Sequence, residues 1–347
     1  MTDTSHKSDR VETITILPQE AELRLDRWFK IHFPEIGYTY LQKLLRSGQV
    51  RLNGKRAESN ARVAVGDEVR VPRIAREKPK EGSVHALKAA STDVATQRIT
   101  NADRDLIESM IIYEDEHVLV LNKPFGLAVQ GGSGTKRHVD GMLTAMADRF
   151  GGERPRLVHR LDRDTTGVLM IAKHRQAASK LGRTFQTRSA AKTYWALVRG
   201  VPAPRQGRIE AALVKAATPD GDRVRKALPG EQEVAMHATT HYSVIERVSQ
   251  KAAWVSLKPV TGRQHQLRAH MHIIGHPIIG DNKYEGDTTE FAGALEPKLH
   301  LHARRLMMPH PITGGTLDVT APLPEHMLKT WEQLGLDPDR FDIVDVE

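Results

Sequence analysis

A short charged run between two apolar segments is the part of the sequence best equipped for chemistry. Asp162 stands between Arg160 and Arg163. A carboxylate beside guanidinium groups stays ionised, as a nucleophile or an electrostatic catalyst must. The alternative is a surface turn held together by ion pairs, because purely structural networks also gather charges in this way. The charge pattern alone favours the surface turn.

The segments around this run predict its place in the fold. Leu157 and Val158 form an apolar run that is too short to bury four charged residues by itself. Residues 167–172 are continuously apolar and are typical of a buried strand, opened by Gly167, which permits a tight bend. We therefore expect the charged run to lie at a turn or strand end, where a substrate can reach it.

The order of residues in this run resembles a known sequence motif. From His159 to Gly167 the sequence is His-Arg-Leu-Asp-Arg-Asp-Thr-Thr-Gly. This string resembles the signature H-R-L-D-x-x-T-S/T-G of the pseudouridine synthases that modify large-subunit ribosomal RNA. The resemblance implies that Asp162 is the essential catalytic residue. It also places Arg160 where it can fill the gap that the target base leaves when it swings out of its stack.

Two further segments resemble motifs of the same family in the same order. Residues 192–194, Lys-Thr-Tyr, resemble its second motif, which implies that Tyr194 stacks against the base and takes the proton from C5. Residues 261–268, Thr-Gly-Arg-Gln-His-Gln-Leu-Arg, resemble T-G-R-x-H-Q-I/L-R. That likeness implies that Arg263 pairs with the catalytic aspartate, that Leu267 packs below the uracil, and that Arg268 serves structure or RNA binding.

A small basic unit precedes these motifs. Residues 25–33 and 39–47 have apolar positions at helical spacing, and residues 49–52 and 68–72 alternate as strands, with an Asn-Gly hairpin signal after the first. Residues 23–72 resemble the S4 RNA-binding domain, which implies phosphate contacts from Lys43, Arg46, Arg51, Lys55 and Arg56. Residues 41–90 hold 12 Lys and Arg against 5 Asp and Glu, a net of +7. A basic solvated face is the alternative.

These observations predict an α+β protein. We expect a polar arm with a short strand (1–22), the S4-like unit (23–72), a basic linker (73–105), a catalytic domain (106–335) and an acidic tail (336–347). The catalytic domain should hold a mixed, mostly antiparallel sheet with flanking helices. Its predicted strands are residues 111–113, 118–124, 126–129, 190–198, 236–248, 254–258, 299–303 and 316–322. Predicted helices span 175–188, 262–274 and a short stretch after Pro324. Residues 202–234 are expected to form strand connections that carry an extended loop, and residues 130–135 are expected to form a flexible loop near the substrate.

Composition limits the partners. The chain has 347 residues, 39% of them hydrophobic, which suffices for a real core, and its formal charge is +8. The positive balance favours an anionic partner such as nucleic acid. There is no cysteine, which excludes a disulfide framework or a thiolate metal site. We find no signal-like segment at the N-terminus and no apolar run of about 18 residues, so we expect a cytoplasmic protein without membrane association.

Neither a cofactor nor a metal is expected. The glycine-rich residues 130–135 lack the Gly-Lys-Ser/Thr ending of a phosphate loop. His265, His270, His272 and His276 are dense enough to suggest zinc, but their spacing is not that of His-Glu-x-x-His, and no nearby acidic residue before Asp281 is placed as a third ligand. Isomerisation of uridine adds no atoms and needs no redox group, which agrees with this reading.

The predicted function is therefore the isomerisation of specific uridines in 23S ribosomal RNA, or in its large-subunit precursor, by a monomer. Asp162 would attack C1′ of the ribose or remove the C2′ proton, and the sequence does not choose between these steps. Two alternatives remain open. One is a noncatalytic RNA-binding or ribosome-assembly factor, and the other is a metal-dependent hydrolase acting on nucleic acid.

Overall fold

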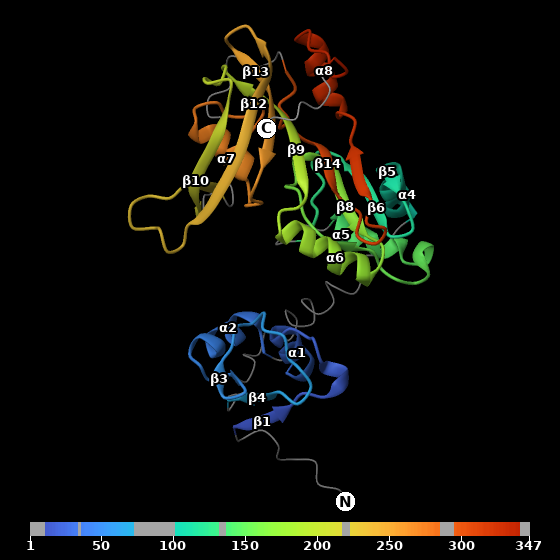
Figure 1. Ribbon diagram of the computed structural model, residues 1–347, viewed down its shortest axis with the longest axis vertical. Coiled ribbons are helices and arrows are strands. Elements are labelled where there is room, and N and C mark those ends of the chain that lie inside the picture. The colour runs from blue at the N-terminus through green and yellow to red at the C-terminus, as the bar shows by residue number, and fades with distance from the viewer. Residues whose placement is uncertain are drawn as a thin grey trace, which may run out of the picture. The chain divides into compact units, whose positions relative to one another are not determined.

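The computed structural model describes residues 11–33, 36–72, 101–131, 137–216, 223–284 and 295–340. The chain divides into two compact units, Met1–Thr92 and Asp93–Glu347, which Figure 1 colours from blue to red along the sequence. The division falls within the predicted linker of residues 73–105, although residues 73–100 lie outside the described residues.

The N-terminal unit packs two short helices on a four-stranded antiparallel sheet in the order β1-β4-β2-β3. Leu25, Trp28 and Phe29 recur at helical spacing and are buried, as are Leu41 and Leu44 in the second helix. Asn53 and Gly54 both have positive φ, as the predicted two-residue hairpin requires. The elements are β1 (Glu12–Thr15), α1 (Leu25–His32), α2 (Tyr38–Arg46), β2 (Arg51–Leu52), β3 (Lys55–Arg56) and β4 (Glu68–Val71).

The predicted start of this unit was wrong. The strand expected in the arm of residues 1–22 pairs along its whole length with β4, from Glu12 opposite Val71 to Thr15 opposite Glu68. Ile16, next to it, is fully buried in the core of the unit. The unit therefore begins by residue 12, because its central strand needs a partner on this side.

The second unit is built on an eleven-stranded sheet with the path β11-β10-β12-β13-β9-β14-β8-β6-β5, to which β15 and β7 add on β14 and β8. All described pairings are antiparallel except that of β14 with β8. The strands are β5 (Ile111–Glu114), β6 (Val118–Lys123), β7 (Arg156–Leu157), β8 (Thr166–Ala172), β9 (Ala191–Arg199), β10 (Gln206–Ala216), β11 (Arg223–Lys226), β12 (Met236–Val248), β13 (Ala252–Pro259), β14 (Leu301–Pro309) and β15 (Thr316–Thr320). This confirms the predicted mixed, mostly antiparallel sheet.

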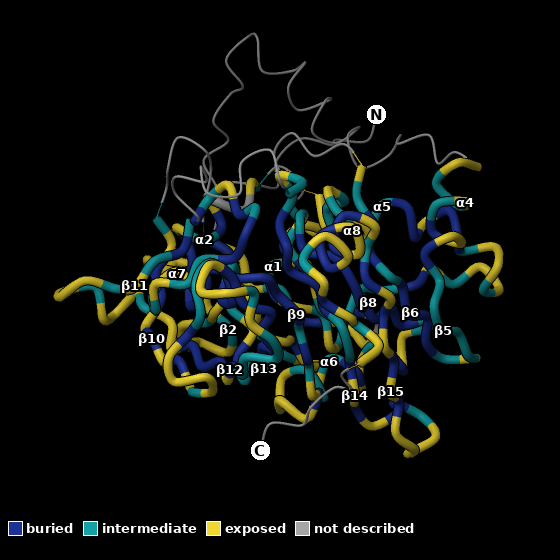
Figure 2. Tube along the Cα trace, turned by 90° about the horizontal axis from the view of Figure 1, so that it is seen from above, coloured by how far each residue is buried: buried dark blue, intermediate teal, exposed yellow. Residues whose placement is uncertain are grey.

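Helices cover both faces of this sheet. Strands β6 and β8 are continuously apolar because both of their faces are buried, as the dark blue segments of Figure 2 show. Alternate residues of these strands face α4 and α5 on one side and α6 on the other. Helix α7 packs on β9 and β13, and α8 packs on the edge-to-face pair Trp195 and Trp254. The helices are α4 (Asn101–Ser109), α5 (Val139–Met142), α6 (Arg175–Gln186), α7 (Gln266–Ile273) and α8 (Glu325–Gln333).

Four local predictions for this unit were wrong. Residues 101–105, expected in the linker, belong to α4, and residues 126–129 form a turn with a single bridge rather than a strand. Residues 202–234 contain β10 and β11, which are regular strands rather than an extended loop. The third helix starts at Gln266 instead of Gly262, because His265 adopts a left-handed conformation (φ 50°) that a helix cannot continue.

Strand β14 lies between β8 and β9 and fixes the geometry of the site. Ala303 pairs with Gly167 of β8 on one side and with Tyr194 of β9 on the other. Strands that are two positions apart lie roughly 10 Å from each other. The segment before β8, which carries Asp162, and the start of β9 therefore face a common space.

Gly167 is needed at this crossing. Its φ is +105°, and a Cβ built on it would lie 2.2 Å from the carbonyl oxygen of Ala303. We expect Gly167→Ala to lower the free energy of unfolding by about 3 kcal/mol, because it adds backbone strain and forces β14 away. Gly182→Ala on α6 is the control, since nothing lies within 4 Å of its added Cβ, and it should stabilise by up to about 1 kcal/mol. Urea unfolding measures both, and an unchanged midpoint for Gly167→Ala would contradict the close approach.

Candidate active site

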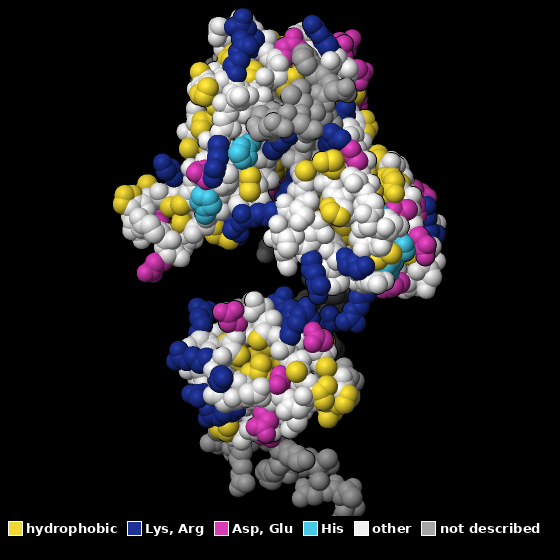
Figure 3. Space-filling view, viewed as in Figure 1, with side chains coloured by type: hydrophobic (Ala, Val, Ile, Leu, Met, Phe, Trp, Pro, Cys, Tyr) yellow, Lys and Arg dark blue, Asp and Glu magenta, His cyan; other side chains and the backbone are white. Residues whose placement is uncertain are grey.

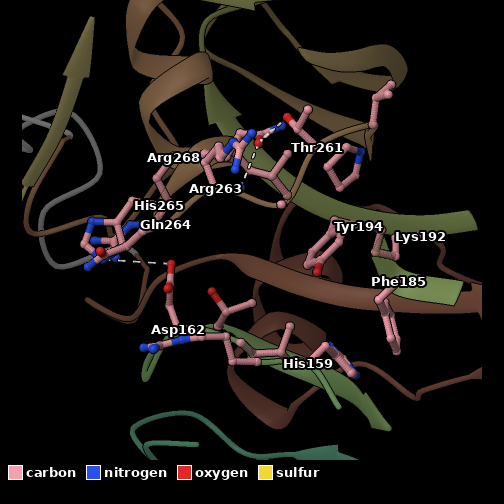
Figure 4. A pocket seen from close by; sticks show the side chains of 18 of the residues that line it. His159, Asp162, Phe185, Lys192, Tyr194, Thr261, Arg263, Gln264, His265 and Arg268 are labelled. Carbon is pink, nitrogen blue, oxygen red and sulfur yellow. Dashed lines mark hydrogen bonds and ion pairs between the residues drawn. The ribbon is translucent and has the colours of Figure 1, made fainter. Parts of the chain in front are cut away.

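One cavity of about 520 Å³ collects the residues that the sequence singles out. Three segments form its walls: the connection from β7 to β8, the end of α6 with the start of β9, and the connection from β13 into α7 (Figure 4). Its lining includes all five predicted residues of the catalytic unit, namely Arg160, Asp162, Tyr194, Arg263 and Leu267. The predicted RNA contacts, Lys43, Arg46, Arg51, Lys55 and Arg56, lie on the N-terminal unit.

The Asp162 segment is anchored from below by a buried lysine. The ammonium group of Lys123 donates to the carbonyl oxygens of Arg163 (2.8 Å), Pro124 (2.9 Å) and Leu127 (2.9 Å). The residue is fully buried, which lowers its pKa to about 7, although the charges of Asp164 and Asp162 act in the opposite direction. The segment of residues 123–127 thus packs beneath the site.

The arginines next to Asp162 in the sequence do not pair with it. Arg163 donates to Asp164 (3.0 Å), and Arg160 donates to the side-chain oxygen of Gln130 (3.3 Å). Among the described residues, Asp162 forms an ion pair with His265 instead, whose Nε2 lies 3.9 Å from Oδ2 (Figure 4). The expectation that Arg160 and Arg163 flank the carboxylate in space was wrong: the chain turns here, with the backbone N–H of Thr165 donating to the carbonyl oxygen of Asp162 (3.2 Å), and both arginines are directed to other acceptors.

The predicted pair between Arg263 and Asp162 is also absent from the described residues. Arg263 directs its Nε to the carbonyl oxygen of His237 (3.3 Å) instead. Arg268 is the buried cation on this side of the cavity, and it donates two hydrogen bonds to Asp281, at 2.7 and 2.6 Å. Burial lowers the pKa of Arg268, but the hydrogen bond and charge of Asp281 and then the charge of Asp162 outweigh it and raise the pKa overall.

The different surroundings of Arg263 and Arg268 have a geometric reason. Arg263 precedes the left-handed His265 and so lies on a loop outside the helix, with its side chain partly exposed. Arg268 follows in the first turn of α7, where its side chain is held inside, 5.3 Å from the ring of Tyr284. A fork to a second carboxylate, Asp281, fixes its direction.

Tyr194 and Leu267 provide the apolar surface of the cavity. They belong to one packed cluster with Leu301, which also lines the cavity. Burial, followed by the charge of Asp162, raises the pKa of the Tyr194 phenol. The phenol therefore stays protonated at neutral pH, and the site offers a flat ring, a hydroxyl and an aliphatic floor.

A second wall comes from residues that the sequence analysis did not identify. His159 stacks on Phe185 with ring centroids 4.6 Å apart, and its Nε2 accepts a hydrogen bond from the backbone N–H of Met170 (2.8 Å). Burial, with a smaller contribution from Lys192, lowers the pKa of His159 to about 3, so its ring is neutral. Lys192 and Arg188 add two cations at this wall. The sequence signal for His159 was that it opens the first motif, and for Lys192 that it opens the second motif, but the pattern gave neither residue a role.

Gln266 holds the loop that carries Arg263 and His265. Its side-chain oxygen accepts from the hydroxyl of Thr261 (2.7 Å) and from the backbone N–H of Arg263 (3.0 Å). Its side-chain nitrogen donates to the carbonyl oxygen of Thr239 (2.9 Å) and to the hydroxyl of Thr240 (3.0 Å). All four hydrogen bonds are made within the protein, so this buried amide fixes the loop rather than offering itself to a ligand.

The four dense histidines point in different directions. His265 faces the cavity, and His272 lies beside Arg223 (3.4 Å). His270 bonds the hydroxyl of Thr240 (2.9 Å), and His276 bonds the carbonyl oxygen of Arg199 (2.9 Å). Throughout the part of the chain that the structure describes, no group of three or more His, Asp or Glu residues is arranged to hold a metal ion. The same residues include no helix that is long and apolar enough to cross a membrane.

Comparison with known proteins agrees with this geometry. Residues 117–272 match the family model described as RNA pseudouridylate synthase. The chain is 35% identical to ribosomal large subunit pseudouridine synthase C of Escherichia coli (strain K12), over 93% of this chain and 97% of that protein. It is 34% identical to the protein of the same name from Vibrio vulnificus (strain CMCP6), over 94% and 97% of the two chains.

A solved structure shares the fold. Human RNA pseudouridylate synthase domain containing 4 is 29% identical, with a TM-score of 0.58, and the match covers 68% of this chain and 98% of that chain. The three motifs, the one cavity that they line together and the similarity along nearly the whole chain lead to one conclusion. The protein belongs to the family of RNA pseudouridine synthases, which are isomerases.

Proposed function

We propose that this enzyme converts specific uridines of 23S ribosomal RNA, or of its large-subunit precursor, to pseudouridine. The observation that carries the proposal is the cavity in which Asp162, Tyr194 and Arg268 meet. Support for the substrate comes from relatives named for the large ribosomal subunit, which match along nearly the full chain. We place the enzyme in the cytoplasm, as a monomer.

Each part of the cavity has a task in this reaction. The C1′–N1 bond breaks, the free uracil turns, and a C1′–C5 bond forms while C5 loses its hydrogen. Asp162 acts at the ribose, by attack on C1′ or by removal of the C2′ proton. Arg268, instead of Arg263, stabilises the charge that develops around this carboxylate, since a fixed guanidinium in a poorly hydrated site acts strongly. Leu267 lies under the uracil and keeps it from leaving.

Arg160 lies at the entrance to the site. Its side chain is exposed and is held by a single long hydrogen bond to Gln130. A uridine must leave its stack to reach Asp162, at a cost of a few kcal/mol, and a planar guanidinium can occupy the vacated space. We therefore assign Arg160 to the displaced base position.

Purified protein and 23S ribosomal RNA labelled with tritium at C5 of uridine provide the test. The proposal predicts release of tritium in step with pseudouridine formation, because C5 exchanges its hydrogen for the ribose. Small-subunit ribosomal RNA, labelled in the same way, is the control. Release from the small-subunit RNA without release from 23S would overturn the substrate assignment.

Tyr194→Phe distinguishes the role of the ring from the role of the hydroxyl, because it keeps the ring and removes the hydroxyl. Because the phenol stays protonated, it can take the C5 proton only while it passes its own hydrogen on. We expect the variant to bind RNA within about twofold of the wild type, since the ring is kept. Turnover should fall by about 10² to 10⁴-fold, the usual worth of a general acid–base group. Single-turnover kinetics would show this, and unimpaired turnover would leave Tyr194 only the stacking role.

The N-terminal unit supports RNA binding by its charge. Lysine and arginine side chains gather on the side of the unit that carries α2 and β3 (Figure 3). The five predicted contacts, Lys43, Arg46, Arg51, Lys55 and Arg56, are all exposed. Arg51 also bonds the carbonyl oxygens of Gly48 (3.2 Å) and Gly54 (3.1 Å), so it holds the hairpin as well. The arrangement of two helices on a small sheet agrees with the S4-like prediction.

Salt dependence tests these contacts. Replacing Lys43, Arg46, Lys55 and Arg56 together by glutamine removes four charges without touching the core. We expect the slope of log K against log salt to become shallower by roughly 3, since each neutralised phosphate contributes a little under one. Binding to a 23S fragment would be titrated at several salt concentrations.

The control for this titration is Arg27→Gln with Lys30→Gln, two exposed cations on α1 that we assign no contact. It should leave the slope unchanged within error. Equal slopes for the four-residue variant and the wild type would mean that the basic surface is merely solvated.

The two competing functions make different demands. A noncatalytic assembly factor needs the basic unit but not a carboxylate, a phenol and a buried guanidinium in one cavity. A metal-dependent hydrolase needs a group of ligands, and the described residues hold none. The cavity therefore favours the isomerase.

A further inference from the structure

His265 occupies an unusual position between α7 and the cavity. It adopts the left-handed backbone conformation (φ 50°, ψ 19°), which is uncommon for residues other than glycine and which gathers at functional sites. Its side chain is 9% exposed, and its Nε2 lies 3.9 Å from Oδ2 of Asp162. Figure 4 shows the imidazole next to the carboxylate at one side of the cavity, with a dashed line between them.

A chain of hydrogen bonds leads from β11 through Tyr284 to Nδ1 of His265. The backbone N–H of Val224, on β11, donates to the hydroxyl oxygen of Tyr284 (2.7 Å). The hydroxyl is then free to donate to Nδ1 of His265 (3.3 Å). A neutral imidazole that accepts at Nδ1 carries its hydrogen on Nε2, the atom that faces Asp162.

The surroundings keep this imidazole neutral near pH 7. Burial lowers the pKa of His265, and the charge of Asp162 offsets this only in part. The charged and titratable groups around it come from four segments. They are Asp162 from the β7–β8 connection, Arg268 from α7, and Asp281, Lys283 and Tyr284 from the segment after α7. Arg223, from β11, lies over the ring of Tyr284. The added positive charge of an imidazolium would meet Arg268 and Lys283 as well as Asp162.

We propose that His265 is a positioning residue that donates a hydrogen bond from Nε2 to Asp162 during the isomerisation, and that Tyr284 sets the tautomer that makes this possible. The inference rests on the proposed function. A hydrogen bond requires the two side chains to approach by about 1 Å when RNA binds. With Oδ2 held by His265, Oδ1 is left for the ribose.

Tyr284→Phe is the informative variant. It removes the hydroxyl but keeps the ring that lies 5.3 Å from the Arg268 guanidinium. Without that donor, Nδ1 can carry the hydrogen, and a lone pair on Nε2 then faces the carboxylate. We expect single-turnover pseudouridine formation to fall about tenfold. Nitrogen-15 NMR of the imidazole should show the hydrogen moving away from Nε2, with the resonance assigned from its loss in His265→Gln.

A double-mutant cycle separates this role from general loss of stability. His265→Ala should also lower the single-turnover rate about tenfold. Adding Tyr284→Phe to this variant should lower the rate no further, because both residues act through one hydrogen bond. His265→Gln, whose amide can donate, should recover most of the rate. Tyr242→Phe is the control. This buried tyrosine of β12 donates to the carbonyl oxygen of Pro204 (3.0 Å), and removing its hydroxyl should leave the rate within about twofold of the wild type.

Two results would overturn the inference: multiplied losses in the double variant, or an imidazole that keeps its hydrogen on Nε2 in Tyr284→Phe. The NMR measurement needs no activity. If the wild-type protein formed no pseudouridine at all, the proposed function would fail, while the tautomer would still be tested.

Discussion

Asp162→Asn should abolish pseudouridine formation while RNA affinity stays within a few fold of the wild type. The amide has nearly the shape of the carboxylate, so the cavity keeps its form. It lacks the negative charge, and it can neither attack C1′ nor accept the C2′ proton. Loss of a group on which the whole reaction depends lowers turnover by about 10⁴-fold or more. Tritium release from C5-labelled RNA measures the rate, and gel mobility measures binding.

Asp164→Asn is the matched control for this variant. Asp164 lies two residues away and pairs with the exposed side chain of Arg163. Asp164 is not among the residues that line the cavity, so the rate should stay within about fivefold. A fully active Asp162→Asn, or an equal loss in both variants, would contradict the assignment of Asp162.

Arg268→Ala should be damaging in two ways. Asp281, 1% exposed, would lose its two charge-assisted hydrogen bonds, and breaking such a buried pair costs about 3 to 5 kcal/mol of stability. The charge that acts on Asp162 would also vanish, so turnover should fall by about 100-fold or more. Arg268→Lys keeps the charge but not the two-pronged geometry, and it should recover part of the stability and little of the rate. Unfolding curves and single-turnover rates separate the two effects.

Arg263→Ala is the comparison that decides which arginine serves Asp162. The structure directs Arg263 to a backbone carbonyl, so its loss should change the chemical step by only a few fold. A reduced affinity for RNA is expected, because the side chain lines the cavity near its surface. If Arg263→Ala were inactive and Arg268→Lys normal, the pairing implied by the family motif would be right and the reassignment wrong.

Much of the fold could be predicted because the core leaves a clear pattern. Met236–Val248 was predicted to the residue, since its alternation is long and unbroken. Strands β6 and β8 were found as continuous apolar runs, which follow from burial of both faces. Strand β10 was missed because its buried positions are few, lie between Ile209 and Val214 and include the small Ala211, so that the charged exposed residues and nearby prolines outweighed them.

The candidate site was predictable as a set of residues but not as a set of contacts. The motifs identified Asp162, Tyr194 and Leu267, and the structure brings them to one cavity. The hydrogen-bond and ion-pair partners of a residue depend on where its side chain points, and here the backbone conformation of one residue decides that direction. The left-handed conformation of His265 delays the start of α7, leaving Arg263 on the loop and turning Arg268 inward, and no local propensity predicts such a residue.

The central claim is that this chain makes pseudouridine in 23S ribosomal RNA with Asp162. The most direct measurement maps every pseudouridine in the ribosomal RNA of cells that lack the protein, and of the same cells supplied with wild type or with Asp162→Asn. The account predicts that a defined set of 23S positions reverts to uridine, that wild type restores it, and that Asp162→Asn does not. An unchanged 23S map in the deletion cells, or full restoration by Asp162→Asn, would contradict it.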